Sequence, residues 1–427
     1  MSTVSSVKQV VSCMDDYDPD ALKVERAREA IKACLVPIAG TERVAVRSAL
    51  GRVLAQDIVP ALNVPAHDNS AMDGYALRAA DLKAEGETVL TEVGAAFAGR
   101  KFEGVLQPGQ CARVMTGAVM PQGADTVVIQ EVVRSENGKV IVPPGQKPKQ
   151  NVRYAGEDLT AGVPVMGPGR LIRPAELGLF ASLGLAEVTV KRKLRVAFFS
   201  TGDELASVGA PLAEGEVYDS NRYTLYGMLM RLGVEVIDLG VVRDDPALLE
   251  AAFLTAARDA DAIVTSGGVS VGDADFTKAM MAKLGEVMFW KIAMRPGRPM
   301  AFGRIGVEGK STALFGLPGN PVAVMVTFYQ FVRDALLHLA GRTDDYAMPL
   351  MRVPTDAPLR KVPGRTEFQR GILYAGPEGW RVRLTGQQGS GVLRSMSEAN
   401  CFIVLEHERG KVEAGELVSV HLFEGLA

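Results

Sequence analysis

The sequence has little cysteine and little histidine, and those present do not form obvious disulfide or metal motifs. The four cysteines, Cys13, Cys34, Cys111 and Cys401, lie far apart and form no CxxC pair. The four histidines form neither an HxH nor an HxxxH pair. Sparse cysteines favour a reducing, cytoplasmic setting over a secreted disulfide scaffold. The histidine spacing argues against a histidine-based zinc site.

Other absences exclude further classes of protein. No apolar run approaches the roughly 18 residues that a membrane-spanning helix needs, and the first residues lack the apolar core of a secretion signal. Lysine plus arginine total 47 against 50 aspartate plus glutamate, a formal net charge of −3. We therefore expect a globular cytoplasmic protein with neither a membrane nor a nucleic acid as partner. Any anion must be held by local groups.

Glycine is the residue in excess, with 45 among 427 residues, against an average of roughly 7%. Many glycines directly follow short apolar segments, where a chain turns tightly beside a ligand. The length suits about three domains, or four if some are small.

The first half of the chain changes pattern twice. Apolar residues at helical spacing predict a helix from about residue 20, with Gly40 as its end. From about Val53 to Val142 the pattern becomes β-like, and Asn137-Gly138 predicts a type I′ hairpin. A second helix is predicted over residues 173–184, after a loop rich in proline and glycine.

From residue 193 short apolar strands alternate with helices. The predicted strands are RVAFFS, VEVIDLG, AIVTS and ALFGL, and each precedes a helical pattern. This alternation indicates a parallel sheet covered by helices on both faces. From about residue 347 strands return without a clear helix, which predicts a small β-barrel or sandwich.

Carboxylates and glycines follow the predicted strands of this sheet. Ligands of open α/β sheets bind beyond the carboxyl ends of the strands, so these loops should share one edge. The acidic side chains in them are Glu204, Asp244, Asp245, Asp273 and Asp275. Such a cluster is typical of a Mg²⁺ site, although Asp245 and Asp275 also fit as helix N-caps.

Two turns at this edge suit an oxyanion. Ser266-Gly267-Gly268 places backbone N–H groups before a helix, an arrangement that favours phosphate. The turn from Pro318 to Pro321 shares this character. Each turn could equally be a tight connection without a ligand.

Basic residues form a third group. Lys291, Arg295 and Arg298 stand around a Pro-Gly turn, and Arg365 follows another. Guanidinium groups fixed by such loops suit tetrahedral oxyanions, whereas the simpler alternative is solvated surface charge. The β-rich part contributes three polar loops that could be functional or plain turns: residues 68–76, 113–118 and 153–158.

Together these motifs resemble the molybdopterin molybdenumtransferase (MoeA) family, which includes the E domain of gephyrin and its plant counterpart. The resemblance rests on DNSAMDGYA, RVMTGA, AGED, STGDEL, YDSN, TSGGVSVGDADF, RPGRP and GLPGNPV, and it covers nearly the whole chain. It implies α/β plus β-rich modules in an elongated multi-domain subunit. The central, mostly parallel sheet would resemble the molybdopterin adenylyltransferases, and the C-terminal domain would be β-barrel-like.

The expected domains combine this resemblance with the pattern changes. They are a discontinuous helical and linking domain (1–52 with 156–190), a β-rich module (53–155), an α/β domain (191–343) and a C-terminal β domain (344–427).

The resemblance also implies a function. The chain would insert molybdate into adenylylated molybdopterin and release AMP with the help of Mg²⁺. It would act as a homodimer, with an active cleft between the α/β domain of one subunit and the β-rich module of the other. A transient contact with a molybdopterin adenylyltransferase is also implied.

Site residues follow by matching motif positions. Asp73, Thr116, Arg153 and Asp158 match residues that reach in from the β-rich module, and Glu204, Asp244 and Asp275 match carboxylates of the nucleotide and metal site. The remaining matches, which bind pterin phosphate, molybdate or neighbouring groups, are Ser266, Gly267, Gly268, Ser270, Lys291, Arg295, Arg298, Pro318, Pro321, Arg365 and Ser390. Relatives commonly have lysine where this chain has Arg295 and Arg298, which changes the oxyanion geometry there.

Two alternatives remain at this point. An adenylyltransferase would need only the α/β domain, so the extra β-rich modules speak against it. A non-catalytic scaffold, as in the receptor-clustering role of gephyrin, would normally have a further fused domain and a long linker.

Overall fold

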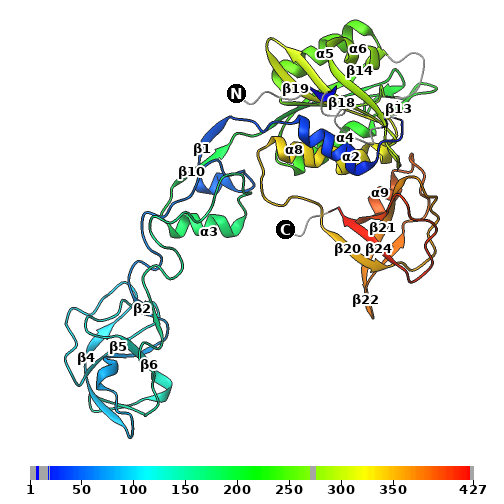
Figure 1. Cartoon of the computed structure of the whole chain (residues 1–427). Coiled ribbons are helices and arrows are strands. Elements are labelled where there is room, and N and C mark those ends of the chain that lie inside the picture. The colour runs from blue at the N-terminus through cyan, green and yellow to red at the C-terminus, as the bar shows by residue number, and fades with distance from the viewer. Residues whose placement is uncertain (1–5, 9–17, 19, 270–275, 424–427) are drawn as a thin grey trace.

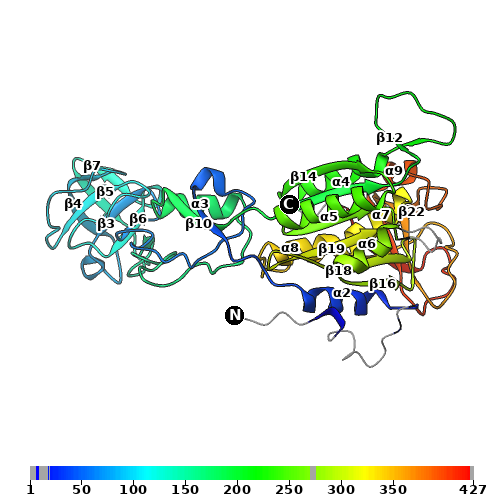
Figure 2. The same ribbon diagram turned by 90° about the horizontal axis from the view of Figure 1, so that it is seen from above.

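The computed structural model describes residues 6–8, 18, 20–269 and 276–423. The subunit is elongated, with a β-rich module at one end and the α/β domain, beside the C-terminal β domain, at the other (Figures 1 and 2). A narrow linking region joins the two ends. The predicted fold class is confirmed, and the distance between the ends determines which site residues can meet within one chain.

The α/β domain is built on a six-stranded sheet with the order β14-β11-β15-β19-β18-β16. The first four strands are parallel, and β18 and β16 run antiparallel at one side. These last two strands were not predicted from the sequence, because no helix follows either. The bounds are β11 Arg195–Thr201, β14 Glu235–Val242, β15 Ala262–Ser266, β16 Gly285–Lys291, β18 Pro299–Val307 and β19 Lys310–Leu317.

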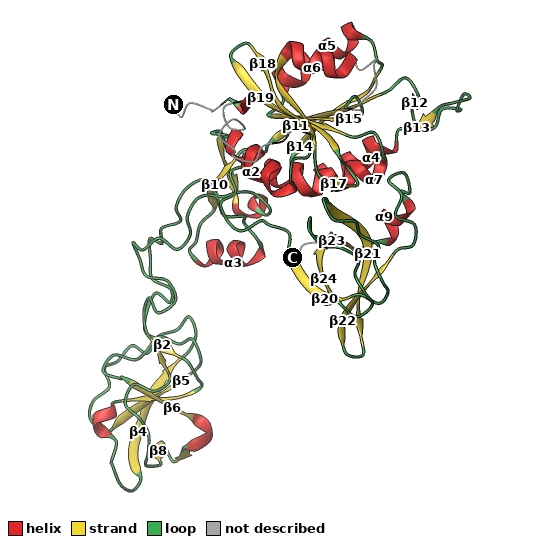
Figure 3. Ribbon diagram, turned by 45° about the vertical axis from the view of Figure 1, so that its right-hand side comes forward, coloured by secondary structure: helices red, strands yellow, loops and turns green. Residues whose placement is uncertain are grey.

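Helices cover both faces of this sheet (Figure 3). One face packs against α5 and α6, and the other against α4, α7 and α8. Caps seen in the sequence set the boundaries: Asp245 accepts hydrogen bonds from the N–H groups of Ala247 and Leu248, and Pro246 begins α5. The bounds are α4 Ser220–Arg231, α5 Pro246–Asp259, α6 Phe276–Leu284, α7 Pro321–Thr327 and α8 Arg333–Leu339.

A π-helical turn, η4 (Phe328–Val332), joins α7 to α8 into a continuous helical run. The run Pro321–Leu339 has the length and mean hydropathy (1.3) of a membrane span, although no such run was expected from the sequence. Of its most apolar window, 72% is buried inside the protein. Phe328, Phe331 and Val332 lie in the largest hydrophobic core, so the run is the core helix of this domain.

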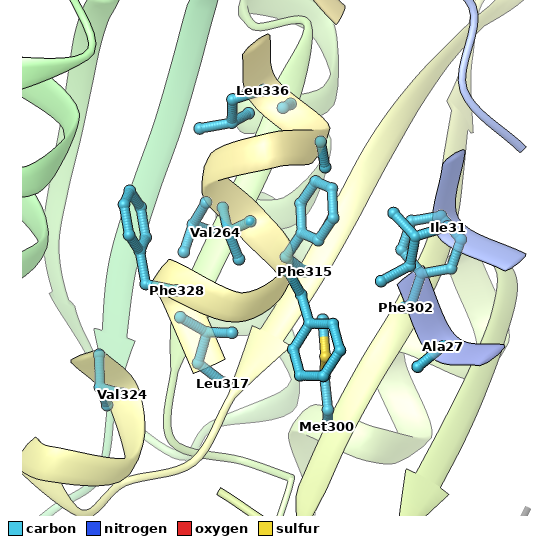
Figure 4. Packing of buried hydrophobic residues seen from close by; sticks show 14 of the residues in the cluster. Ala27, Ile31, Val264, Met300, Phe302, Phe315, Leu317, Val324, Phe328 and Leu336 are labelled. Atoms are coloured by element: carbon cyan, nitrogen blue, oxygen red, sulfur yellow. The ribbon is translucent and has the colours of Figure 1, made fainter. Parts of the chain in front are cut away.

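The N-terminal helix α2 (Val24–Cys34) also packs on the α/β domain. Its apolar face contributes Ala27 and Ile31 to the core beside Phe302 (Figure 4). The domain boundaries predicted from the sequence place this helix with the linking domain, whereas its buried side chains pack in the core of the α/β domain. It also ends earlier than Gly40, because Pro37 disfavours helical backbone at the preceding residue.

The linking region is made from two distant segments of chain. Strand β1 (Thr41–Ala45) pairs antiparallel with β10 (Glu187–Lys191), and α3 (Pro174–Ser182) packs beside the short helix η1 (Val46–Ala49). The outgoing and returning segments are further joined by isolated bridges at Val53–Leu171, Leu54–Val190, Ile58–Met166 and Val64–Leu159.

The β-rich module contains a six-stranded sheet with the order β6-β3-β5-β4-β8-β7, beside the two-stranded β2-β9. The predicted hairpin is confirmed: Asn137 and Gly138 both have positive φ, 51° and 71°, as a type I′ turn requires. The bounds are β2 Asn69–Ser70, β3 Gly74–Leu77, η2 Ala79–Asp81, β4 Thr88–Ala96, β5 Gln110–Val114, β6 Thr126–Ile129, η3 Gln130–Val132, β7 Arg134–Glu136, β8 Lys139–Val142 and β9 Val152–Arg153.

The strands of the C-terminal domain form a closed ring, which is the barrel of the two architectures predicted from the sequence. The strands follow the order β22-β21-β23-β24-β20. The bridge between Thr355, just after β20, and Val382 of β22 closes the ring. A short helix, α9 (Arg394–Glu398), was not predicted. The strands are β17 Met294–Arg295, β20 Leu350–Pro354, β21 Thr366–Gly376, β22 Gly379–Leu384, β23 Cys401–Leu405 and β24 Leu417–Leu422.

The linking region should lose stability in acid through one buried carboxylate. Glu176 in α3 accepts hydrogen bonds from the side chains of Arg173 and Arg170 at 3.0 and 2.8 Å. The contact with Arg173 is the main cause that lowers the pKa of Glu176 to about 2. A depressed carboxyl pKa stabilises the fold above the unfolded pKa, and this contribution is lost as the pH falls through the folded one.

We predict that lowering the pH from about 4.5 toward 2 removes roughly 3 kcal/mol of local stability. Amide exchange of α3, corrected for its intrinsic pH dependence, measures this loss. Glu176→Gln should abolish it, whereas Glu187→Gln, at the half-exposed pair with Arg43, should leave it intact. An unchanged pH dependence in Glu176→Gln would contradict the assignment.

Candidate active site

The four parallel strands of the α/β domain end at one edge of the sheet. Ser266 at the end of β15 is in register with Ser200 of β11 and Leu317 of β19, and Thr201 is in register with Val242 of β14. The loops after these strands therefore share that edge. They carry the predicted residues Glu204, Asp244, Gly267, Gly268, Pro318 and Pro321.

The turn after β15 requires both of its glycines. Gly267 and Gly268 have φ of 94° and 67°, a region that other residues rarely adopt. A Cβ on Gly267 would lie 2.5 Å from the carbonyl oxygen of Thr201, and one on Gly268 would lie 2.4 Å from Cβ of Thr277. The backbone thus passes close to the end of β11. Ser270 and Asp275, predicted in the same loop, lie outside the described residues, as does Asp273.

Asn221, at the start of α4, joins two of these loops and was not singled out from the sequence. Its side-chain nitrogen donates to Oγ of Ser266 at 2.9 Å and to the carbonyl oxygen of Gly319 at 2.7 Å. The residue is 8% exposed. The YDSN motif contained it, but only the fold shows what its amide holds.

Buried polar atoms without a partner gather around this edge. Among the described residues they include Ser200 Oγ, Thr201 Oγ1, Thr265 Oγ1, Asp219 Oδ2 and Asn221 Oδ1. Buried polar groups in folded proteins are nearly always hydrogen-bonded. Their concentration here fits an edge that receives a polar ligand.

The predicted carboxylates reach the edge with different roles. Glu204 lies just beyond β11, and Oε2 of Glu204 is 2.6 Å from where a Cβ on Gly202 would stand. The backbone N–H of Asp244 donates to Oδ1 of Asp203 at 3.3 Å. Asp245 acts as the N-cap of α5. The described residues form no group of three potential metal ligands.

The antiparallel strands bring two predicted cations to the same edge. Lys291, the last residue of β16, is in register with Pro299 of β18, and β18 starts where β19 ends. Nζ of Lys291 lies 2.6 Å from Oδ1 of Asp20, and Arg298 donates to the Asp20 carbonyl oxygen at 3.3 Å. The contact with Lys291 is the main cause that lowers the pKa of Asp20.

Arg295 and Arg365 lie at the junction with the C-terminal domain. Arg295 of β17 is in register with Glu367 of β21, and Arg365 donates to Oε1 of that carboxylate at 2.9 Å. Arg295 borders a cavity of about 530 Å³. The other lining residues include Pro296, Pro358, Arg360, Glu367, Phe368, Gln369, Arg370, Leu384, Gly386 and Gln388.

Ser390 also reaches the α/β domain from this side. Its carbonyl oxygen accepts a hydrogen bond from the N–H of Val322 at 3.1 Å. Val322 follows Pro321 in the first turn of α7. The C-terminal domain therefore contacts the same edge as the parallel strands.

The remaining predicted residues are in the β-rich module. Oδ1 of Asp73 accepts from the backbone N–H and hydroxyl of Thr116, at 2.7 and 2.8 Å, which lowers the Asp73 pKa. Arg153 pairs with Asn69 across β2 and β9, and the N–H of Asp158 donates to Val64. Figures 1 and 2 show the module far from the sheet edge, so one chain does not bring the two groups together.

The sequence matches one family along most of its length. Residues 22–184 match the MoeA N-terminal region (domain I and II), residues 197–338 a probable molybdopterin-binding domain, and residues 352–423 the MoeA C-terminal region (domain IV). The molybdopterin molybdenumtransferase of Haemophilus influenzae is 44% identical over 407 residues, covering 95% of this chain and 99% of that protein. The chain belongs to the MoeA family.

Other MoeA proteins extend the likeness. The molybdopterin molybdenumtransferase of Bacillus subtilis is 35% identical, covering 90% of each chain. The molybdopterin biosynthesis MoeA protein of Pyrococcus horikoshii superposes with a TM-score of 0.81 at 28% identity, covering 95% of this chain and 100% of that one. The resemblance stated from the motifs is thereby confirmed. The chain is a transferase of molybdenum cofactor biosynthesis that inserts molybdenum.

Removal of the Asn221 amide should lower the activity of this MoeA protein without unfolding it. In Asn221→Ala, Ser266 and Gly319 lose their shared donor, and unpaired buried groups of this kind cost about 1–3 kcal/mol. We predict a fall of roughly 10- to 100-fold in kcat/KM for molybdenum insertion, measured at an unchanged far-ultraviolet circular dichroism spectrum. Thr224→Ala, which removes a hydroxyl bonded within α4, is the control. Equal activity of the two variants would contradict the role of Asn221.

Proposed function

We propose that the chain inserts molybdate into adenylylated molybdopterin, releases AMP, and does so in a cleft completed by a second subunit. The observation that carries this proposal is the group of unpaired buried polar atoms at the carboxyl edge of the sheet, beside the Ser266-Gly267-Gly268 turn. A phosphate-bearing ligand fits that edge because the hydroxyl groups of Ser200, Thr201 and Thr265 are buried there without a partner.

The protein's own contribution would be positioning and charge neutralisation. The turn at Ser266 would hold a phosphate of the pterin substrate, and Arg295, Arg298 and Lys291 would attract the oxyanions. Asp20 already contacts Lys291 and Arg298, so an arriving oxyanion would have to displace it. Exposed ion pairs of this kind contribute little free energy, so replacing Asp20 by an oxyanion would cost little stability.

No nucleophilic side chain is needed for this reaction. Water would add to the phosphoanhydride, whose P–O bond breaks as AMP leaves. The two dithiolene sulfurs would bind molybdenum, and one oxygen of molybdate would leave as a water molecule that carries the two sulfur-bound protons. The oxidation state of molybdenum stays the same, so no external oxidant or reductant is required.

Carboxylate oxygens at the edge fit the preference of Mg²⁺ for oxygen ligands. Mg²⁺ is commonly bound through one or two carboxylates, waters and substrate phosphates, and Glu204 and Asp244 are the described residues that would hold it. When bound, the ion would neutralise charge on the phosphoanhydride. Asp275, the third predicted ligand, lies outside the described residues.

A direct assay separates this function from adenylate synthesis. Adenylylated molybdopterin, molybdate and Mg²⁺ should yield AMP and molybdenum-loaded cofactor in equal amounts, measured by chromatography and metal analysis. An excess of a Mg²⁺ chelator should lower the rate at which both products form. Molybdopterin and ATP without molybdate should yield no adenylate. Formation of adenylate from ATP would instead identify an adenylyltransferase.

The second subunit is proposed because the β-rich module lies far from the edge of its own chain (Figure 2). Asp73, Thr116, Arg153 and Asp158 would then complete the cleft of a partner. An adenylyltransferase must supply the substrate, and we propose a transient contact with it in the cytoplasm.

Mixed dimers test the shared cleft. Asp73→Ala on one chain and Asn221→Ala on the other should give one cleft with both changes and one with neither. We predict about half of the wild-type insertion rate for doubly tagged, purified mixed dimers, above either homodimeric variant. Absence of recovery would show that each subunit uses its own module.

A further inference from the structure

The guanidinium of Arg370 is buried where the C-terminal barrel meets the α/β domain. Arg370 lies in β21 and is 1% exposed. Its Nε donates to Oγ of Ser395 at 3.0 Å, and its Nη2 donates to the carbonyl oxygens of Gly389 at 2.9 Å and Gln387 at 3.4 Å. All of these acceptors belong to the segment from residue 387 to α9.

Within the part of the chain that the structure describes, Arg370 makes no hydrogen bond to a carboxylate. Burial is the main cause that lowers its pKa to about 10, with Arg295 as a second positive neighbour. The group therefore stays charged at neutral pH. A buried charge destabilises a fold unless hydrogen bonds satisfy it. The carbonyl oxygens of Gln387 and Gly389 provide such bonds for the guanidinium of Arg370.

The main chain of Arg370 contacts the same segment. Its N–H donates to Oε1 of Gln388 at 2.7 Å, and its carbonyl oxygen accepts from the N–H of Thr385 at 3.1 Å and from Nε2 of Gln388 at 3.2 Å. The loop of residues 385–390 is thus bound to one residue from several sides. These main-chain contacts do not depend on the side chain, so substitutions of Arg370 remove only the hydrogen bonds of the guanidinium.

This loop leads directly to the candidate site. Next to Gly389, the carbonyl oxygen of Ser390 accepts from the N–H of Val322 in the first turn of α7. Gly319, just before α7, accepts from Asn221, which also donates to Ser266. A short series of hydrogen bonds and chain neighbours therefore connects Arg370 with the turn at the sheet edge.

We propose that Arg370 is a positioning residue, which holds the loop of residues 385–390 against the first turn of α7 and so fixes the barrel side of the oxyanion site. It acts through the loop, and Ser390 is the residue it presents. The structural part stands on the contacts above, whereas the kinetic consequence rests on the function proposed here.

Arg360 provides a matched control for charge. It lines the same cavity as Arg370, but its side chain has no hydrogen bond to the loop among the described residues. Arg360→Gln therefore changes the charge of the cavity without releasing the loop. Arg370→Lys keeps the charge and loses the planar fork of donors.

Amide exchange and kinetics of the full-length protein test the proposal together. Arg370→Gln and Arg370→Lys should exchange about tenfold faster in peptides covering residues 319–326 and 385–391, because the guanidinium hydrogen bonds to Gln387 and Gly389 are lost. Arg360→Gln should match the wild type in both peptides. The KM for molybdate should rise about tenfold in both Arg370 variants, with less than a twofold change in kcat.

Unchanged exchange in both Arg370 variants, or equal acceleration in Arg360→Gln, overturns the positioning role. Faster exchange with an unchanged KM for molybdate also overturns it, because the loop would then not reach the reaction. If Arg370→Gln does not fold, Ser395→Ala, which removes one acceptor, should show a smaller acceleration in the same peptides. Failure of the wild type to insert molybdenum refutes the proposed function instead, and leaves the exchange result valid.

Discussion

A close approach of backbone at the end of β15 is the constraint on which the site depends. Gly267 passes so near to Thr201 that a Cβ would lie 2.5 Å from its carbonyl oxygen. This approach brings the ends of β11 and β15 together, at the place where the sheet order reverses and where α/β sheets bind their ligands. Asn221 then attaches the end of β19 through Gly319.

Neighbouring elements bring positive charge to that edge and place the C-terminal barrel beside it. Strands β16 and β18 bring Lys291 and Arg298 to it, and the pairing of β17 with β21 brings the barrel. Asp20, ahead of α2, is already bonded to the two cations. The Asp20 carboxylate therefore contacts Lys291 and its main-chain carbonyl contacts Arg298, and in the function proposed here an oxyanion substrate would have to displace both contacts.

The sequence predicted much of the fold, for identifiable reasons. The alternation of strands with helical patterns predicted α4 and α5, Asp245 was recognised as a possible cap of α5, and the type I′ hairpin followed from Asn137-Gly138. The antiparallel strands were missed because no helix follows them. The burial of α2 was visible in its apolar face, but its packing partner, beside Phe302, depends on the tertiary fold.

The candidate site was only partly visible in the sequence. Strand ends that share an edge follow from a parallel sheet, so Glu204, Ser266 and Pro318 could be grouped in advance. Asn221 and Arg370 act through partners about 20 to 100 residues away, and no local pattern reveals such contacts. The separation of Asp73 from the edge depends on the linking region (Figure 1).

The central claim is that the carboxyl edge of the α/β sheet receives the nucleotide-linked pterin. Amide exchange of the intact protein, with and without adenylylated molybdopterin, measures this most directly. We predict slower exchange in the segments 201–206, 265–269 and 317–322 when the compound is bound. Protection confined to another surface, with these three segments unchanged, would contradict the account.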